Sequence, residues 1–358
     1  MKNVLLAAGV SAETDPFLFS VSAVAPIIIQ MALGYFLKRA GVLTAEFLKK
    51  ANRICYLVFL PVLLFKNVYD VKSISNIDPA FLIFACSAIL IVFAVCAVYV
   101  RFCIKEPDER GALLQCSFRS NYAIIGVPLA TSLYGSAGAA AASLMSAFSI
   151  PIFNVLAIVS LSMFKGKGTK VNVKKVIKEI VTNPLIIGIA VGVVFLVVRE
   201  ILTANGSDFR LFGEWNAAEE TLTYNFLGEA LKSVAQVATP LSLVVLGGQF
   251  EFSAVKDLAK YITVGVALRN FIVPAVCLTA AYFVFPDMKG EYAATFIALF
   301  ASPVAVSSAI LAMEMENDEV LAGQLVVWTT VISAVSLFLI IYVFSSVSYT
   351  HLTLPTIR

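Results

Sequence analysis

The chain has 358 residues, of which 60% are apolar and only 14% are charged, and its mean hydropathy is +0.91. A soluble domain needs a surface of roughly 25–35% Asp, Glu, Lys and Arg, so this composition excludes a soluble particle and indicates an integral membrane protein in the lipid bilayer. The net charge of +3 comes without a basic patch interleaved with aromatic residues, so no nucleic-acid partner is expected.

Ten apolar stretches are long enough to cross a bilayer, which takes about 20 residues of helix. Backbone polar groups in lipid must bond within their own segment, so we predict an all-α integral membrane protein with ten transmembrane helices. The first five are predicted at Phe17–Leu37, Ala51–Asp70, Ala80–Ile104, Gly111–Tyr134 and Ala139–Phe164. The second five are predicted at Leu185–Leu202, Phe226–Gly248, Leu258–Phe285, Tyr292–Met313 and Val320–Phe344.

The spans divide the chain into two similar units. Residues 1–16 form a short N-terminal tail, 17–164 the first five-helix unit, 165–184 a basic loop and 185–344 the second unit. Residues 345–358 resemble nothing before them, and we interpret them as a non-native tail, with no role for His351. Residues 203–225 are expected to form a connecting loop.

Lysine and arginine cluster in the loop after the first span and in the loop after the fifth, KGKGTKVNVKKVIKE. These loops lie on the same side if there are ten spans. The positive-inside rule then places them in the cytoplasm and both termini outside a cytoplasmic (cell) membrane. The second loop could bind anionic lipid, although a topological anchor is the simpler interpretation.

Prolines suggest an internal repeat. Pro61 and Pro128 lie in the second and fourth spans, and Pro240 and Pro303 lie in the seventh and ninth. Because each unit has an odd number of spans, the second copy would be inverted in the membrane, as in inverted-repeat transporters. Each proline removes a backbone hydrogen bond, so we predict broken helices four and nine.

Polar side chains gather at the two predicted breaks, where they are costly unless they face protein or water. The fourth span, SNYAIIGVPLA, combines Asn121 and Tyr122 with Gly126 and Pro128, and the ninth, FASPVAVSSA, combines Ser302 and Pro303 with Ser307. Arg119, Asn154 and Arg269 are further candidates. Each of these three has an alternative to a role in substrate binding. Asn154 could associate helices, Arg269 could snorkel toward the membrane interface, and Arg119 could form a structural pairing.

No catalytic constellation is present, so we expect a protein that is not an enzyme. The single histidine excludes a Ser-His-Asp set, and no GxxxxGK[ST] loop for ATP occurs. The six cysteines form no CxxC pair, so no metal site and no cofactor are predicted.

Several motifs in order resemble the auxin efflux carrier (PIN-like) family, as a bacterial member. They are PIIIQMALGYFLKRAGVL, NRICYLVFLPVLLF, the Asn121-x4-Gly126-x-Pro128 crossover, NPLIIGIAVGVV and SPVAVSSAILAMEMENDEVLAG. The resemblance implies ten helices in two inverted five-helix repeats, a scaffold of helices one, two, six and seven, a moving domain of the others and a possible homodimer. Plant members often carry an amide near the ninth-helix break, where this chain has Ser302 and Ser307.

These observations predict a secondary transporter of small organic anions, auxin-like or dicarboxylates such as malate or malonate. The substrate-binding candidates are the residues at the two breaks with Arg119, Asn154 and Arg269, and helix N-termini would attract the carboxylate. Two alternatives stay open: a sodium-coupled carrier of the bile-acid symporter type, and a membrane receptor that transports nothing.

Overall fold

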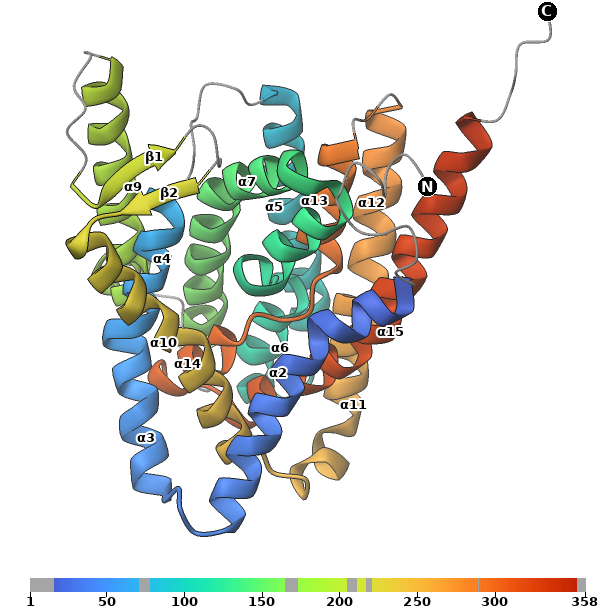
Figure 1. Ribbon diagram of the computed structural model, residues 1–358. Coiled ribbons are helices and arrows are strands. Elements are labelled where there is room, and N and C mark those ends of the chain that lie inside the picture. The colour runs from blue at the N-terminus through green and yellow to red at the C-terminus, as the bar shows by residue number, and fades with distance from the viewer. Residues whose placement is uncertain are drawn as a thin grey trace, which may run out of the picture.

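The computed structural model describes residues 16–70, 78–164, 173–204, 211–216, 221–286, 288 and 290–352, which are almost entirely helical (Figure 1). The first half contains α2 (Pro16–Arg39), α3 (Ala45–Ile54), α4 (Leu60–Tyr69), α5 (Pro79–Cys103), α6 (Pro107–Phe118), α7 (Val127–Met163) and α8 (Val173–Thr182). The second half contains α9 (Pro184–Ala204), α10 (Phe226–Gln249), α11 (Ala254–Val266), α12 (Val273–Val284), α13 (Gly290–Ala301), α14 (Ser307–Glu314) and α15 (Glu319–Leu352).

Three π-helical turns are inserted between these helices: η1 (Cys55–Phe59), η2 (Tyr122–Gly126) and η3 (Ala267–Ile272). Each π turn is followed two residues later by a proline at the start of the next helix: Pro61, Pro128 or Pro274. A proline cannot donate to the preceding turn and its ring crowds that turn, so the wider π turn provides the space that it needs.

Seven helical segments among the described residues are long and apolar enough to cross a membrane. They are 45–69, 79–103, 137–163, 184–202, 226–249, 254–284 and 319–343, and they coincide with seven of the predicted spans. The predicted first span falls in α2. The predicted fourth span is divided into α6, η2 and the first part of α7. The predicted ninth span is divided into α13 and α14.

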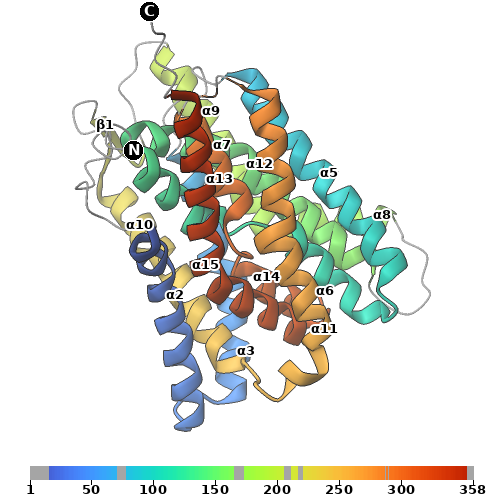
Figure 2. The same cartoon turned by 90° about the vertical axis from the view of Figure 1, so that its right-hand side faces the viewer.

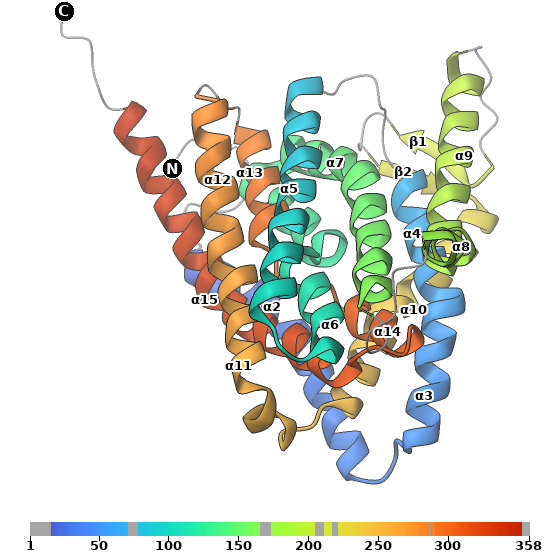
Figure 3. The same ribbon diagram turned by 180° about the vertical axis from the view of Figure 1, so that it is seen from behind.

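The helices form two groups that meet along α2 and α15. In one group, α4 packs against α9 and α10 packs against α2. In the other, α5, α12 and α15 lie side by side, as the views in Figures 2 and 3 agree. Glycines allow the α2–α10 contact, because a Cβ on Gly34 would lie 2.1 Å from the Val244 carbonyl oxygen. A Cβ on Gly247 would lie 1.8 Å from the Met31 carbonyl oxygen.

Three details differ from the predictions. The first break lies at residues 119–121, before Gly126 and Pro128, because the π turn lets the helix continue through them. Residues 203–225 are not a plain loop, since β1 (Gly213–Asn216) and β2 (Thr221–Tyr224) form an antiparallel hairpin. α15 continues beyond Phe344 to Leu352. By contrast, the boundary predicted between spans four and five is confirmed, because α7 is interrupted at Tyr134 and Gly135, whose backbone angles are not helical. Residues 1–15, 165–172 and 353–358 of the predicted tails and basic loop lie outside the described residues.

Candidate substrate-binding site

The two broken helices cross each other at their breaks and pair through their backbones. Ser120 and Val304 form an isolated antiparallel bridge. The Asn121 N–H donates to the Pro303 carbonyl at 2.8 Å, and the Ala305 N–H donates to the Arg119 carbonyl at 3.4 Å. Each break therefore supplies partners for backbone groups that the other has released, which a low-dielectric environment requires.

Arg269 lies behind this crossing, on the side of the helix C-termini. Its guanidinium donates to the carbonyls of Ser302 (2.8 and 2.6 Å), Phe118 (3.1 Å) and Leu299 (3.2 Å), and the residue is 1% exposed. Phe118 ends α6, and Leu299 lies in the last turn of α13. One cation thus satisfies the carbonyl ends of both half-helices, where a positive charge is favourable.

Arg119 lies at the other side of the crossing and has only neutral partners. It donates to Asn154 Oδ1 at 2.8 Å, to Ser307 Oγ at 3.0 Å and to Ser308 Oγ at 3.5 Å, and it is 2% exposed. Within the described part of the chain, Arg119 forms no ion pair. A buried cation without a counter-charge is costly, so this position favours an anion.

A cavity of about 60 Å³ opens beside Arg119, and we call it the central cavity. Its polar lining comes from the first break, α7, α10 and the start of α14: Arg119, Ser120, Asn121, Asn154, Thr239, Ser242 and Ser307. Two buried polar atoms of this lining, Ser120 Oγ and Asn121 Nδ2, have no hydrogen-bond partner among the described residues. Together with the guanidinium they offer a convergent set of donors to an oxygen-rich ligand.

The structure brings together half of the predicted site residues. Arg119, Asn121, Tyr122, Asn154 and Ser307 line the central cavity, although the Tyr122 hydroxyl donates away from it, to the Ala142 carbonyl at 3.0 Å. The other five do not line it: Gly126, Pro128, Ser302, Pro303 and Arg269.

Gly126 instead allows close packing, because a Cβ there would lie 3.0 Å from the Ala298 carbonyl oxygen of α13. Sequence reasoning missed Thr239 and Ser242, which lie on α10 on either side of Pro240 and Leu241. The two hydroxyls close to a mid-span proline were the feature of the sequence that could have predicted a polar cavity wall on α10.

Two further cavities lie beyond the central one. A cavity of about 150 Å³, lined by Asn67, Asp70, Ser143 and Ser146, shares Ala123 and Ile150 with the central cavity. A larger cavity of about 490 Å³ lies between the ends of α2 and α10 and the start of α15. Along α10, Leu246 and Gln249 of the larger cavity follow Ser242 of the central one by one and two turns. The three cavities therefore lie along the faces of α4 and α10 that meet α7, α14 and α15.

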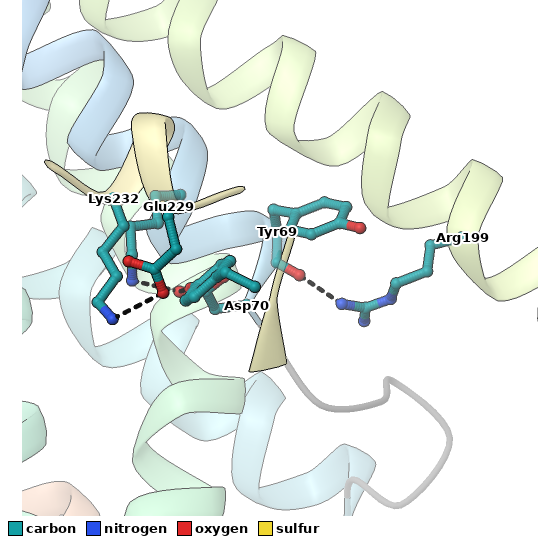
Figure 4. Close-up of polar contacts among 7 residues, drawn as sticks. Tyr69, Asp70, Arg199, Glu229 and Lys232 are labelled. Atoms are coloured by element: carbon teal, nitrogen blue, oxygen red, sulfur yellow. Dashed lines mark hydrogen bonds and ion pairs between the residues drawn. The ribbon is translucent and has the colours of Figure 1, made fainter. Parts of the chain in front are cut away.

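A polar cluster closes the end of α4 near the 150 Å³ cavity (Figure 4). Asp70 accepts from Lys66 at 2.5 Å and from the Tyr224 hydroxyl at 2.6 Å, while Lys232 pairs with Glu229 at 3.2 Å. Burial, and then the nearby Asp70 carboxylate, raise the pKa of Tyr224. The cluster fastens the β1–β2 hairpin to the ends of α4 and α10, so its role here is structural.

The described residues contain no group of three His, Cys, Asp or Glu side chains that could hold a metal ion. The site is thus a buried, donor-rich cavity between two crossed, broken helices in an apolar helical protein. That combination defines the class as a multi-pass membrane transport protein, in which irregular backbone at membrane depth lines a cavity.

Comparison with known proteins gives the family. The family model described as "Membrane transport protein" matches residues 19–341, and the chain belongs to this auxin efflux carrier-like family, as the sequence motifs predicted. An uncharacterized transporter of Methanothermobacter thermautotrophicus is 23% identical over 323 residues, covering 90% of this chain and 97% of the relative. The uncharacterized transporter MJ1031 of Methanocaldococcus jannaschii is 24% identical over 312 residues, covering 85% of this chain and 92% of the relative.

A relative that matches only part of the chain is the lysosomal cholesterol signaling protein of Mus musculus, which is 25% identical over 205 residues, covering 52% of this chain and 23% of that protein. The family and the archaeal relatives confirm that the chain is a membrane transporter and not an enzyme.

Proposed function

We propose that this protein is a secondary carrier of small organic anions and that Arg119 is the charge partner of the substrate carboxylate. The observation that carries the proposal is the burial of this guanidinium against neutral side chains only, at the wall of the central cavity. Ser307 begins α14 and Asn121 precedes η2, so two helix N-termini add their partial positive charge to the same place.

The fold supports the proposal through its symmetry. Counting α2 and the two broken helices with the seven candidate spans gives the ten expected crossings, five on each side of the α7–α9 connection. Both units contain a broken helix, and the breaks pair in antiparallel fashion. We interpret this arrangement as two inverted five-helix repeats with the substrate at their crossing.

Transport by alternating access requires the cavity to open to each side in turn. The 150 Å³ and 490 Å³ cavities along the same faces of α4 and α10 are the candidate routes. We place both termini on the outer side of the cytoplasmic membrane. Because the cell interior is negative, export of one negative charge gains about 2.3 kcal/mol per 100 mV of membrane potential. Such a carrier needs neither ATP nor a resident cofactor. A homodimer stays a prediction, which light scattering of the purified protein tests.

Flux into proteoliposomes tests the function. Labelled malate, malonate and indole-3-acetate are offered with and without a sodium or proton gradient, to the parent and to Arg119→Gln and Asn121→Ala. Losing a charged hydrogen-bond donor costs about 1.5–3 kcal/mol, so we expect Arg119→Gln to raise KM by about tenfold to a hundredfold. Asn121→Ala is expected to raise KM less, because it removes a neutral donor.

The matched control is Arg101→Gln, which removes the same charge from an exposed position at the end of α5. Unchanged KM in both cavity variants would refute the site. Strict sodium dependence would favour a carrier of the bile-acid symporter type, and anion binding without flux would favour a receptor.

A further inference from the structure

The outer face of α8 combines lysines with aliphatic side chains at helical spacing. Lys174, Ile177, Lys178 and Val181 follow one another at i, i+3, i+4 and i+7, so they lie on one face. All four are exposed, Ile177 at 55% and Val181 at 65%. This face is distinct from the transport site and from the buried helix contacts.

The opposite side of α8 is fixed to the protein. Val176 and Ile180 are half-buried, and Ile180 packs against the main hydrophobic core. Glu179 accepts a hydrogen bond from the Ser162 hydroxyl of α7 at 2.5 Å. The acidic side chain of this helix is therefore engaged with the protein. Neither Lys174 nor Lys178 forms an ion pair within the described part of the chain, so the outer face carries an unbalanced positive charge.

The position of α8 places this face at a membrane surface. The helix has ten residues, about 15 Å, so it cannot span the bilayer, and it connects α7 to α9, which both contain candidate spans. In Figure 3, α8 is seen end-on while α7 and α9 are seen from the side, so α8 runs across them. A short crosswise helix between two spans lies at the level where acyl chains meet headgroups.

We infer that the Lys174–Ile177–Lys178–Val181 face of α8 binds the anionic phospholipid surface of the bilayer. Ile177 and Val181 enter the acyl boundary, while the two lysine stems lie along it and carry their ammonium groups to headgroup phosphates. The neutral zwitterionic surface offers the same apolar boundary but less negative potential, so the lysines make the binding selective. The ligand is thus a phospholipid with net negative charge, such as phosphatidylglycerol.

The chain contains its own control. Lys256 and Lys260 of α11 have the same i, i+4 spacing and are also exposed, but Ala259 and Thr263 occupy the places of Ile177 and Val181. The α11 face also carries two exposed lysines, but Ala259 and Thr263 are too short to enter the acyl boundary. Replacing either lysine pair by glutamine removes two charges from an exposed helix face, so both variants are expected to fold.

The test uses the full chain with Ile177→Trp in vesicles, read as the added fluorescence over that of the parent. Brominated phosphatidylglycerol and brominated phosphatidylcholine are compared as quenchers at increasing mole fraction. We expect quenching by both lipids, with half-quenching at a lower fraction of phosphatidylglycerol. We expect Lys174→Gln/Lys178→Gln to weaken that preference by on the order of tenfold, and Lys256→Gln/Lys260→Gln to leave it unchanged.

Three results would overturn the inference: no quenching at Ile177→Trp, equal quenching by the two lipids, or equal effects of the two lysine pairs. A further arm adds soluble glycerol phosphate. Loss of the phosphatidylglycerol preference in that arm would show that the lysines take a free phosphoryl group and not a lipid surface. The apparent Tm of each variant, measured in detergent, confirms that quenching is compared between folded proteins.

Discussion

The two buried arginines of the crossing are expected to respond in opposite ways to removal of their charge. Arg269 makes four hydrogen bonds to three backbone carbonyls. Arg269→Met leaves those carbonyls buried without this donor. At about 1–3 kcal/mol for each unsatisfied group, the loss is at least about 3 kcal/mol. With about 2.1 cal/mol/K of unfolding entropy per residue, this corresponds to a fall of roughly 4 °C or more in apparent Tm.

Arg119→Met is the matched comparison, because the same side chain is removed from the same crossing at nearly the same burial. Its partners Asn154, Ser307 and Ser308 are side chains that can rotate and pair with one another. The substitution also relieves an unbalanced charge. We therefore expect the apparent Tm to stay unchanged or to rise, while anion transport is lost.

The assay is thermal unfolding of both variants in the same detergent, followed by flux in proteoliposomes. Equal losses of stability in the two variants would refute the assignment of Arg269 to the helix ends and of Arg119 to the ligand. An unchanged apparent Tm in Arg269→Met would show that the three carbonyls find other partners.

Two further predictions concern single polar contacts. Asn154→Asp places a carboxylate where Oδ1 now lies 2.8 Å from Arg119, so an internal counter-ion competes with the substrate and the KM for anions should rise. The control Asn154→Ser should change KM less. An unchanged KM in Asn154→Asp would contradict the role of the Arg119 charge. Between α5 and α6, a hydrogen bond from Tyr261 lowers the pKa of the exposed Glu106 carboxyl. Because the pKa is lower in the folded state, the Glu106 carboxylate stabilises the protein above the unfolded pKa of Glu, and this stabilisation is lost as the pH falls through the folded pKa. The apparent Tm of Glu106→Gln should therefore fall less steeply on acidification than that of the parent. Identical slopes would exclude this contribution.

The helical membrane class could be predicted because composition and span length follow directly from the solvent in which the chain folds. Seven spans appear close to their expected ranges, since runs such as 79–103 and 184–202 are apolar throughout. The crossing itself could be anticipated from Pro128 and Pro303, but not the position of the first break. A proline predicts that a helix is disturbed, and only the structure shows that η2 absorbs the disturbance and moves the opening to residues 119–121.

The two arginines show the limit of sequence reasoning about the site. Both are single cations inside predicted spans, and the sequence contains no local difference that separates a side chain at the wall of the central cavity from one that caps helix ends. The distinction depends on α13 and on α14, which lie far along the chain from Arg119. Ser242 was missed for a similar reason, because a serine within a span more often bonds its own helix backbone.

The bridge between Ser120 and Val304 has a mechanical consequence. Because the breaks exchange backbone hydrogen bonds and share Arg269, α6, η2, α13 and α14 are coupled at their centre and cannot slide past one another without breaking those bonds. The walls of the central cavity contributed by α4 and α10 have no such bond to the crossing among the described residues: their contributions are leucines, Thr239 and Ser242. Sliding is therefore least hindered at that leucine-lined surface, where side-chain contacts can be exchanged one after another without exposing a backbone amide to lipid.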